Sequence, residues 1–468
     1  MSFELPPGFL KRLKSVIGEE KVSTSPTELI LHDHDVLFGI YHGKVDAVVK
    51  PTGIEDVVEV LKLCNEYRVP VYTQGALTSL TGASIPQGGV VLDMSGLRRI
   101  LEISLENAYV RAEAGVRIDE INERLAGTGF FFPVDPASVK SATVGGAIAT
   151  NAGGMRGFRY GPMKNWVLGL KVVLADGTVL NLGGKTLKRR QGYELMSLFI
   201  GSEGTLGVIV EVTLKIARKP EAIARIVGFF KNYRDMVRAA LRVRVEARPL
   251  TMEFLDNELA KIASEYAGVD IPEEAAYVLL VDVDGPGEVL DKLLDEVLVI
   301  FRTEGAAEIR YSTDPMEIEK LYELRRAMYP AALNLRGKIR ENVMVEDLVV
   351  PPTRLMEVFD GIYKLAKEYD FPVYLGGHIG DGNVHPLIFY NSNERDRMMK
   401  LHREMHRLAL SLEGGISAEH GIGLVKKELL AEEFRHLGSP KALDIMRAVK
   451  KVLDPKGILN PGKVVDIE

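Results

Sequence analysis

Two histidines flank a glycine-rich turn in the last quarter of the chain. The stretch 376–385 reads Gly-Gly-His-Ile-Gly-Asp-Gly-Asn-Val-His and lies between two apolar runs. Asp-Gly between strand-like runs predicts a β-hairpin with a two-residue turn. That turn would place His378 opposite His385 on one sheet face, with Cβ atoms about 4.5–5.5 Å apart. Asn383 would share the face, because alternate residues of a strand point the same way. Two imidazoles above small glycines predict a metal site that needs one more ligand.

A second glycine-rich stretch, 414–423, offers that ligand. It reads Gly-Gly-Ile-Ser-Ala-Glu-His-Gly-Ile-Gly, so Glu419 supplies a carboxylate and His420 a titratable group beside it. Neighbours in a regular strand point apart, so we expect Gly421 and Gly423 to distort the backbone. Two histidines and one carboxylate suit Zn²⁺ first, and Mn²⁺, Fe²⁺ or Co²⁺ as well. The alternative is a glycine-rich hairpin with two ordinary histidines, and the partner stretch weighs against it.

Other histidines are less informative. His402 and His406 are four residues apart in a helix predicted over 392–412 and could share a metal. The sequence places no carboxylate beside them, so packing on the flank of a helix explains them adequately. The run 32–35, His-Asp-His-Asp, predicts a solvated loop, because adjacent side chains diverge.

The totals limit the class of protein. With 468 residues the chain predicts two or three domains. A net charge of −6 without a basic cluster argues against nucleic acid as a partner. Cys64 is the single cysteine, which excludes an intrachain disulfide and a cysteine metal cage. The absence of a signal-peptide pattern and of a membrane-length apolar run predicts a cytoplasmic protein with at most peripheral membrane contact.

The first half follows a β-α-β rhythm and carries small-residue loops. A strand near 69–73 leads into the loop 74–82, Gln-Gly-Ala-Leu-Thr-Ser-Leu-Thr-Gly, whose backbone N–H groups could face a phosphate. Four glycines between 145 and 154 would let the backbone approach a large flat ligand. A hairpin over 168–182 and the run 198–209 close this half.

The second half alternates strands with helices, which predicts a ferredoxin-like antiparallel sheet covered by helices. The whole chain is therefore expected to be α+β. We expect an N-terminal helical segment over 1–46, a ligand-binding domain over 47–219, a substrate or cap domain over 220–425, and a C-terminal helical segment over 426–468.

Three motifs in the first half carry a family resemblance. Thr-Asn-Ala-Gly-Gly at 150–154, Arg-Tyr-Gly at 159–161 and Phe-Ile-Gly-Ser-Glu-Gly-Thr-Leu-Gly at 199–207 resemble the flavin domain of the vanillyl-alcohol-oxidase/PCMH superfamily. Within it, the chain is similar to the group formed by the GlcD component of glycolate oxidase, D-lactate dehydrogenase and D-2-hydroxyglutarate dehydrogenase. The resemblance covers essentially the whole chain and implies a PCMH-type FAD-binding domain.

The resemblance also implies which residues would contact FAD. The family's loop usually reads Arg-Gly-Gly-Gly-Thr-Ser, whereas residues 74–79 here lack the guanidinium and two of the glycines. Because the only cysteine or histidine between 47 and 217 is Cys64, outside the ligand loops, the FAD is expected to be non-covalent. The implied FAD-binding residues are Gln74, Gly75, Ala76, Leu77, Thr78, Ser79, Thr81, Pro133, Asp135, Ser138, Thr143, Val144, Gly145, Gly146, Asn151, Gly153, Gly154, Glu203, Gly204, Ile209 and Asn460.

The resemblance assigns roles at the proposed site. His378, His385 and Glu419 match the family's divalent-metal ligands, and His420 matches its general base. Arg325 aligns with the arginine that holds the substrate carboxylate; alone it would be interpreted as a helix-surface arginine. Asn383, beside His385, is included among the catalytic residues.

The implied reaction is oxidation of a small D-2-hydroxy acid to the 2-oxo acid. In D-2-hydroxyglutarate enzymes a lysine helps to hold the second carboxylate, and Val345 stands at that position here, with Glu346 adding negative charge beside it. D-lactate is therefore favoured over D-2-hydroxyglutarate or glycolate.

Two other classes stay open: a non-redox flavoenzyme on the same fold, and a metal-binding or interaction protein without flavin. No Rossmann glycine motif follows a strand, so NAD is not the expected acceptor. The acceptor could be a quinone, a cytochrome, an electron-transfer flavoprotein, a dye or oxygen. The oligomeric state, a homodimer included, is equally open.

Overall fold

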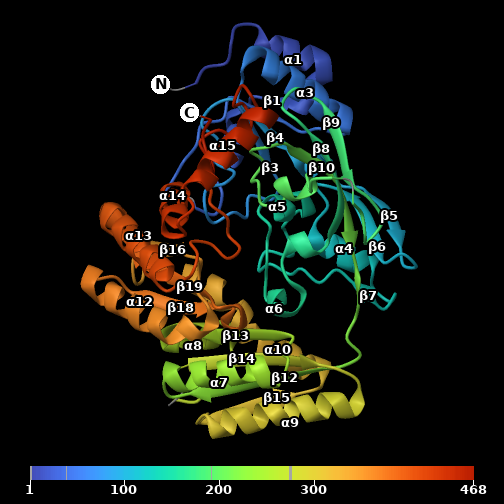
Figure 1. Cartoon of the computed structure of the whole chain (residues 1–468). Coiled ribbons are helices and arrows are strands. Elements are labelled where there is room, and N and C mark those ends of the chain that lie inside the picture. Colours follow the sequence, from blue (N-terminus) through green and yellow to red (C-terminus); the bar gives the residue numbers. More distant parts are fainter. Residues whose placement is uncertain (1–2, 38–39, 191, 274–276, 468) are drawn as a thin grey trace. The chain divides into compact units, whose positions relative to one another are not determined.

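The protein is described by a computed structural model that covers residues 3–37, 40–190, 192–273 and 277–467. The chain divides into two compact units. The first comprises 1–153, 162–218 and 419–468, and the second comprises 154–161 and 219–418. Both units combine helices with sheets (Figure 1), which confirms the predicted α+β class.

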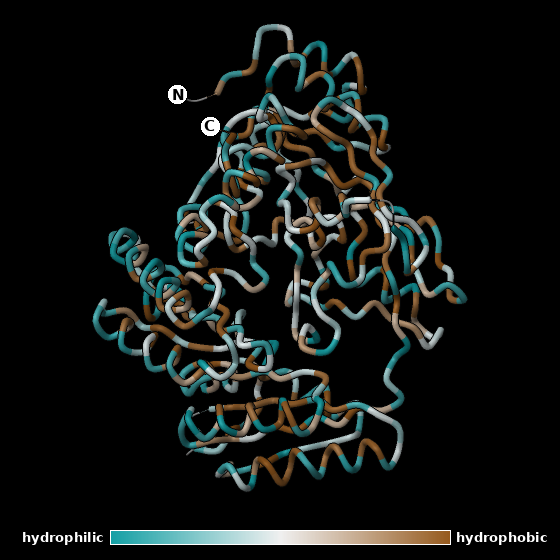
Figure 2. Tube along the Cα trace, viewed as in Figure 1, coloured by the Kyte–Doolittle hydropathy of each residue, from teal (hydrophilic) through white to brown (hydrophobic). Residues whose placement is uncertain are grey.

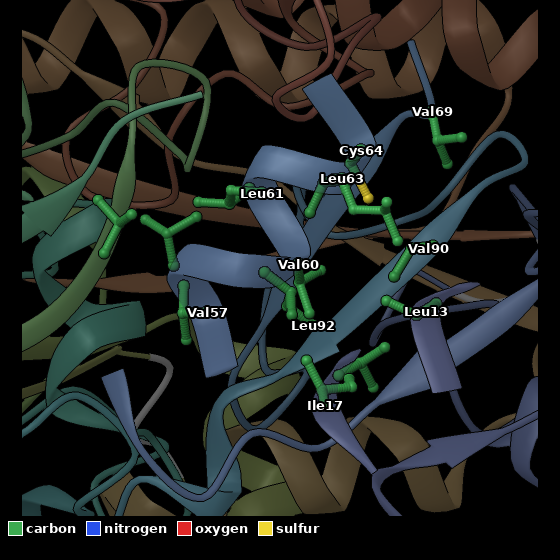
Figure 3. Packing of buried hydrophobic residues seen from close by; sticks show 14 of the residues in the cluster. Leu13, Ile17, Val57, Val60, Leu61, Leu63, Cys64, Val69, Val90 and Leu92 are labelled. Atoms are coloured by element: carbon green, nitrogen blue, oxygen red, sulfur yellow. The ribbon is translucent and has the colours of Figure 1, made fainter. Parts of the chain in front are cut away.

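The first unit contains a four-stranded sheet in the order β1-β2-β4-β3. Strands β2 and β3 run parallel to β4, because helix α3 carries the chain back to the start of the sheet. Helix α3 packs on this sheet with residues spaced three and four apart (Figure 3), namely Val57, Val60, Leu61 and Cys64. Burial raises the pKa of the Cys64 thiol, as expected for a core cysteine. The elements are α1 (Phe9–Ile17), η1 (Glu19–Lys21), β1 (Val22–Ser23), α2 (Pro26–Leu31), β2 (Ala47–Val49), α3 (Ile54–Tyr67), β3 (Val71–Gln74), β4 (Val90–Asp93) and η2 (Met94–Gly96).

The first unit also contains a five-stranded antiparallel sheet in the order β5-β6-β10-β8-β9. Its strands are largely brown in Figure 2, and they enclose a separate apolar core with helices α4 and α5. The elements are β5 (Ile100–Ser104), β6 (Tyr109–Glu113), α4 (Ile118–Arg124), β7 (Phe130–Phe131), α5 (Val144–Ala149), η3 (Met163–Asn165), β8 (Val167–Val173), β9 (Val179–Gly183), η4 (Met196–Leu198), β10 (Val208–Lys215), β11 (Ala217–Arg218), α14 (Lys427–His436) and α15 (Lys441–Leu453).

The second unit is built on an eight-stranded antiparallel sheet with the path β15-β12-β14-β13-β18-β19-β16, and β17 also pairs with β19. Side chains alternate between its two faces. On β12, Phe229 joins the core formed with α8, α10 and α11, whereas Phe230 packs against Phe301 of α9. Helices therefore cover both faces, and the strands read as apolar runs.

The elements of the second unit, in chain order, are α6 (Gly157–Tyr160), β12 (Ile223–Phe230), α7 (Tyr233–Glu246), β13 (Thr251–Leu255), α8 (Asn257–Ala267), β14 (Tyr277–Asp284), α9 (Gly287–Thr303), β15 (Glu308–Ser312), α10 (Pro315–Arg326), α11 (Met328–Asn334), β16 (Asn342–Val345), β17 (Leu348–Val349), η5 (Pro352–Arg354), α12 (Leu355–Tyr369), β18 (Val373–Gly377), η6 (Ile379–Asp381), β19 (Asn383–Tyr390), η7 (Ser392–Glu394) and α13 (Arg395–Ser411). Among the described residues, no helix is both long and apolar enough to cross a membrane.

The turn between β18 and β19 differs from the prediction. A two-residue turn was wrong: residues 378–382 connect the strands, and Gly376, not His378, pairs with His385. The backbone is left-handed at Gly382 (φ 77°), and a Cβ there would lie 2.0 Å from the carbonyl oxygen of Val350. The close approach of residue 350 therefore selects the longer turn, which the Asp-Gly pair alone did not reveal.

Candidate active site

His378 and His385 converge despite the longer turn. Their ring centroids are 5.3 Å apart with planes at 88°, and a ring nitrogen of each lies within 4.8 Å of the other. His378 immediately precedes η6 and His385 lies on β19, so each ring is held by a regular element. Both side chains are buried. The structure thus brings together the two histidines that the sequence singled out.

Each ring is oriented by a partner at Nδ1. His378 Nδ1 lies 2.7 Å from Oε1 of Glu253, and His385 Nδ1 lies 2.9 Å from the carbonyl oxygen of Glu346. A carbonyl and a carboxylate are acceptors, so both Nδ1 atoms donate and both Nε2 atoms keep a lone pair. This is the arrangement that metal-binding histidines use.

Asn383 adds a polar atom to the same place. It lies two residues before His385 on β19 and so shares that face, and its backbone N–H donates to the carbonyl oxygen of His378 at 3.2 Å. Its side-chain Oδ1 is buried and has no hydrogen-bond partner among the described residues. A buried orphan acceptor beside two imidazoles fits a bound cation or a substrate hydroxyl.

Glu253 is a functional residue that the sequence reasoning missed. It lies on β13, is fully buried, and accepts hydrogen bonds from His378 and from Nε of Arg325 at 2.5 Å. Arg325 is itself buried, so it is not the helix-surface arginine of the alternative interpretation. The available signal was a single carboxylate inside the apolar run Thr-Met-Glu-Phe-Leu at 251–255.

Glu346 does not add negative charge for a substrate to meet. It is buried, and its two carboxylate oxygens lie 2.7 Å from Nδ1 of His402 and 3.0 Å from Nε2 of His406. Burial alone would raise the pKa of Glu346, but the charges and hydrogen bonds of the two histidines outweigh burial and hold it well below its usual range. The argument from repulsion by Glu346 was therefore wrong, and His402 and His406 do have a carboxylate beside them.

The next residue, Asp347, anchors the end of the second unit. Its Oδ2 accepts hydrogen bonds from Oγ of Ser417 at 2.6 Å and from the backbone N–H of Ala418 at 2.9 Å. Asp347 is fully buried. These bonds fix the segment that immediately precedes Glu419 in the chain.

Glu419 and His420 belong to the first unit, where they lie among the predicted flavin loops. A Cβ on Gly153 would lie 2.7 Å from Oε2 of Glu419, so that glycine makes room for the carboxylate. The backbone is left-handed at Gly421 and Gly423, as the sequence predicted. Thr81 Oγ1 donates to the carbonyl oxygen of His420 at 3.4 Å.

Glu203 braces the same segment. Its carboxylate accepts from the backbone N–H groups of Ile422 at 2.6 Å and Gly423 at 2.8 Å. Burial raises the pKa of Glu203, and these two hydrogen bonds oppose that rise. Asn460 then donates to the carbonyl oxygens of Ala83 and Glu203 at 2.8 and 2.6 Å. Four segments far apart in sequence are thereby joined.

The loop after β3 meets the start of α5. A Cβ on Gly75 would lie 2.3 Å from Oγ1 of Thr143, the residue that caps α5 by accepting from the N–H of Gly146. The Gln74 side chain is occupied in shaping the loop, since it bonds to the His32 ring at 2.6 Å and to the carbonyl oxygens of His32 and Ser84 at 2.9 Å. His32 and Asp35 are buried, so the predicted solvated loop over 32–35 was wrong.

Strained backbone gathers in these loops. Outside glycine, left-handed φ angles occur at Leu77 (57°), Asn151 (52°), Glu203 (51°) and Asn460 (42°). Such conformations cost about 1–3 kcal/mol each and cluster at ligand sites. All four are among the residues predicted to contact FAD, so the loops fit a bound ligand approached by backbone.

The remaining predicted FAD residues lie near these loops in the chain. Pro133, Asp135 and Ser138 lie between β7 and α5, Thr143 to Gly146 begin α5, Gly153 follows α5, and Gly204 and Ile209 lie before and at the start of β10. Gly154 falls in the second unit.

Comparison with known proteins identifies the family. Residues 45–183 match the family described as "FAD binding domain", and residues 219–464 match "FAD linked oxidases, C-terminal domain". The chain belongs to the FAD-linked oxidases. The predicted PCMH-type FAD-binding domain and its oxidase partner domain are thereby confirmed for this FAD-linked oxidase.

Several curated relatives of this FAD-linked oxidase match nearly end to end. "Glycolate oxidase subunit GlcD" of Bacillus subtilis is 33% identical over 97% of this chain and 96% of its own length. "D-lactate dehydrogenase" of Archaeoglobus fulgidus is 36% identical over 89% of this chain and 91% of its own. "D-2-hydroxyglutarate dehydrogenase, mitochondrial" of Bos taurus is 32% identical over 95% and 81%. The three names differ in substrate at similar identity, so identity alone does not choose among them.

Solved structures support the fold of this FAD-linked oxidase. p-Cresol methylhydroxylase superposes with a TM-score of 0.81 at 17% identity, covering 99% of this chain and 98% of that chain. An alkyldihydroxyacetonephosphate synthase superposes with a TM-score of 0.74 at 19% identity, covering 98% and 85%. At such identities the likeness concerns the fold alone.

Proposed function

We propose that this FAD-linked oxidase oxidises a small D-2-hydroxy acid, with D-lactate first, to the 2-oxo acid and passes the electrons to an acceptor other than NAD. The observation that carries the proposal is the pair His378 and His385, buried and with both Nδ1 atoms committed to acceptors. An FAD-linked oxidase of phenols or lipids has no need of two such imidazoles, whereas a hydroxy acid offers a chelating hydroxyl and carboxylate.

Non-covalent FAD and one divalent ion complete the proposed site. We assign the ion to Nε2 of His378, Nε2 of His385 and the Glu419 carboxylate, with Asn383 Oδ1 in reach of the ion or of the substrate hydroxyl. Zn²⁺ is the first choice, and Mn²⁺, Fe²⁺ or Co²⁺ also suit this donor set. Such an ion supplies a Lewis acid that lowers the pKa of the substrate hydroxyl. The bound flavin supplies the two-electron acceptor for the hydride that leaves C2.

The chain's own residues move the proton and hold the substrate. His420 is proposed to take the hydroxyl proton on a ring nitrogen, since an imidazole titrates near neutral pH. Arg325 has five N–H donors, of which Nε is committed to Glu253 and Nη1 makes a long contact of 3.5 Å with Met328 Sδ. The remaining donors can hold the substrate carboxylate.

Preference for a monocarboxylate now depends on Val345 alone. Val345 ends β16, paired with Leu387 of β19, and offers no cation to a second carboxylate. The charge of Glu346 is compensated by His402 and His406 and gives no further support. Glycolate is the second candidate, favoured by the near end-to-end match with the glycolate oxidase relative.

A substrate panel tests this proposal. With a dye as acceptor, kcat/KM should be highest for D-lactate among D-lactate, L-lactate, glycolate, D-2-hydroxybutyrate and D-2-hydroxyglutarate. His420→Ala should lose turnover while retaining FAD and metal. Preference for D-2-hydroxyglutarate or for an L-acid would overturn the substrate assignment, and turnover in His420→Ala would remove His420 as the base. Replacing the dye by a quinone, a cytochrome or an electron-transfer flavoprotein then identifies the acceptor class.

A further inference from the structure

A second cluster of metal-ligand side chains lies inside the second unit. It consists of Glu346, His402 and His406, which we call the α13 cluster. The exposed fractions are 1% for Glu346 and 0% for each histidine. One ligand atom from each of the three lies within 4.8 Å of the others. None of these residues is among the ligands proposed for the active-site ion.

The α13 cluster is held by rigid elements. His402 and His406 are one turn apart on the 17-residue helix α13, so they project from the same side. The helix is anchored by buried neighbours such as Met398 and Met405. Glu346 lies in the connection between β16 and β17, and its backbone N–H donates to the carbonyl oxygen of Pro386 at 2.9 Å.

The charge of Glu346 needs a counter-charge. A buried carboxylate is strongly disfavoured unless it is paired or coordinates a metal. Among the described residues, its ion partners are His402 and His406, and no lysine or arginine reaches it. The compensating charge is therefore either a proton on an imidazole or a cation held between the three groups.

The geometry favours a cation of the zinc class. The two carboxylate oxygens each face a different imidazole nitrogen, at 2.7 and 3.0 Å. Ligand atoms in a tetrahedral site with bonds of about 2.0–2.1 Å lie about 3.3 Å apart, so an opening of a few tenths of an ångström would admit an ion. Two imidazoles and one carboxylate select Zn²⁺ and its first-row neighbours over Mg²⁺ or Ca²⁺.

We propose that the α13 cluster binds a second divalent transition-metal ion, distinct from the one at His378 and His385. This ion joins helix α13 to the β16–β17 connection. The same connection carries the backbone carbonyl that orients His385, at 2.9 Å, and Asp347, which anchors Ala418. The second ion is thus a structural brace for the segment beneath the active site.

Metal stoichiometry tests the proposal on the full-length flavoprotein. The protein is stripped by dialysis against a chelator, re-equilibrated with Zn²⁺ alone and assayed by elemental analysis, because flavin absorption obscures optical metal probes. Wild type should bind two Zn²⁺ per chain. The variant His378→Ala/His385→Ala leaves the α13 cluster intact and should bind one. Addition of Glu346→Gln, which preserves side-chain shape, should reduce that value to none.

His436→Ala serves as the matched control, since this histidine is exposed on α14, and it should leave two Zn²⁺ bound. Far-UV circular dichroism and flavin content establish that each variant is folded. A folded His378→Ala/His385→Ala variant that binds no Zn²⁺ would overturn the second site. One ion in wild type, retained in that variant and lost on Glu346→Gln, would instead support the second site and remove the first. In the double variant, Zn²⁺ should also raise Tm, and an unchanged Tm would count against a structural brace.

Discussion

Glu253 joins Arg325 to His378, and Glu253→Gln is the sharpest perturbation of the proposed active site. Glutamine keeps the size of the side chain but removes its charge. The carboxylate accepts from Arg325 Nε at 2.5 Å and from His378 Nδ1 at 2.7 Å. An amide has one acceptor oxygen, so one of these two donors would face an NH₂ group instead.

Two effects of different size follow. Arg325 is 5% exposed, and removal of one partner of a buried ion pair costs about 3–5 kcal/mol of unfolding free energy. His378 would lose the acceptor that fixes its tautomer, and such a loss costs about 10- to 100-fold in metal affinity. We expect both losses in Glu253→Gln.

Denaturant unfolding gives the first quantity, and competition with a chelator of known affinity gives the second. Glu246→Gln is the matched control: Glu246 pairs with Arg242 on the exposed side of α7, and we expect no measurable change in either quantity. If Glu253→Gln unfolds within about 1 kcal/mol of wild type and binds metal equally well, Glu253 neither compensates Arg325 nor orients His378.

Three further predictions concern the cofactor, the ion and pH. Acid precipitation should release all flavin into the supernatant, because Cys64 is buried on α3 and outside the flavin loops; flavin in the pellet would contradict this. His385→Ala should retain FAD and lose turnover together with one bound ion, as measured by flavin absorbance, dye reduction and metal content; full turnover would exclude His385 as a ligand. Burial raises the pKa of Asp256 from its ordinary 3.8 to about 7, so the folded state holds a proton that the unfolded state releases. Stability should therefore fall as pH rises from about 4 to 7, by about 1.4 kcal/mol per unit of pKa difference at most. Asp256→Asn should flatten this slope in thermal unfolding, and an unchanged slope would assign it to other groups.

Much of the framework follows from local patterns. The helix predicted from 54 to 67 is α3 with the same bounds, and the strand predicted from 251 to 255 is β13. Spacings of two or of three and four residues reflect which side of an element is buried, and this information is contained within one segment. The convergence of His378 and His385 was also local, because a turn of either length brings the two strand ends together.

The partners of the site residues could not be predicted in this way. The pairing of Glu253 with His378 spans 125 residues, that of Glu346 with His402 spans 56, and that of Glu203 with Gly423 spans 220. The first depends on β13 lying beside β18, a property of sheet order that no local pattern encodes. The direction of Glu346 depends on how the β16–β17 connection meets β19, and it reversed the interpretation of that side chain.

The sequence by itself determined the two-half α+β organisation, the glycine-rich loops and the histidine pair, since residue type and spacing act within single segments. Only the tertiary structure decided which carboxylate compensates which cation or imidazole. A buried charge must find its partner wherever the packed chain brings one, and the order of strands and the register of their turns set that meeting.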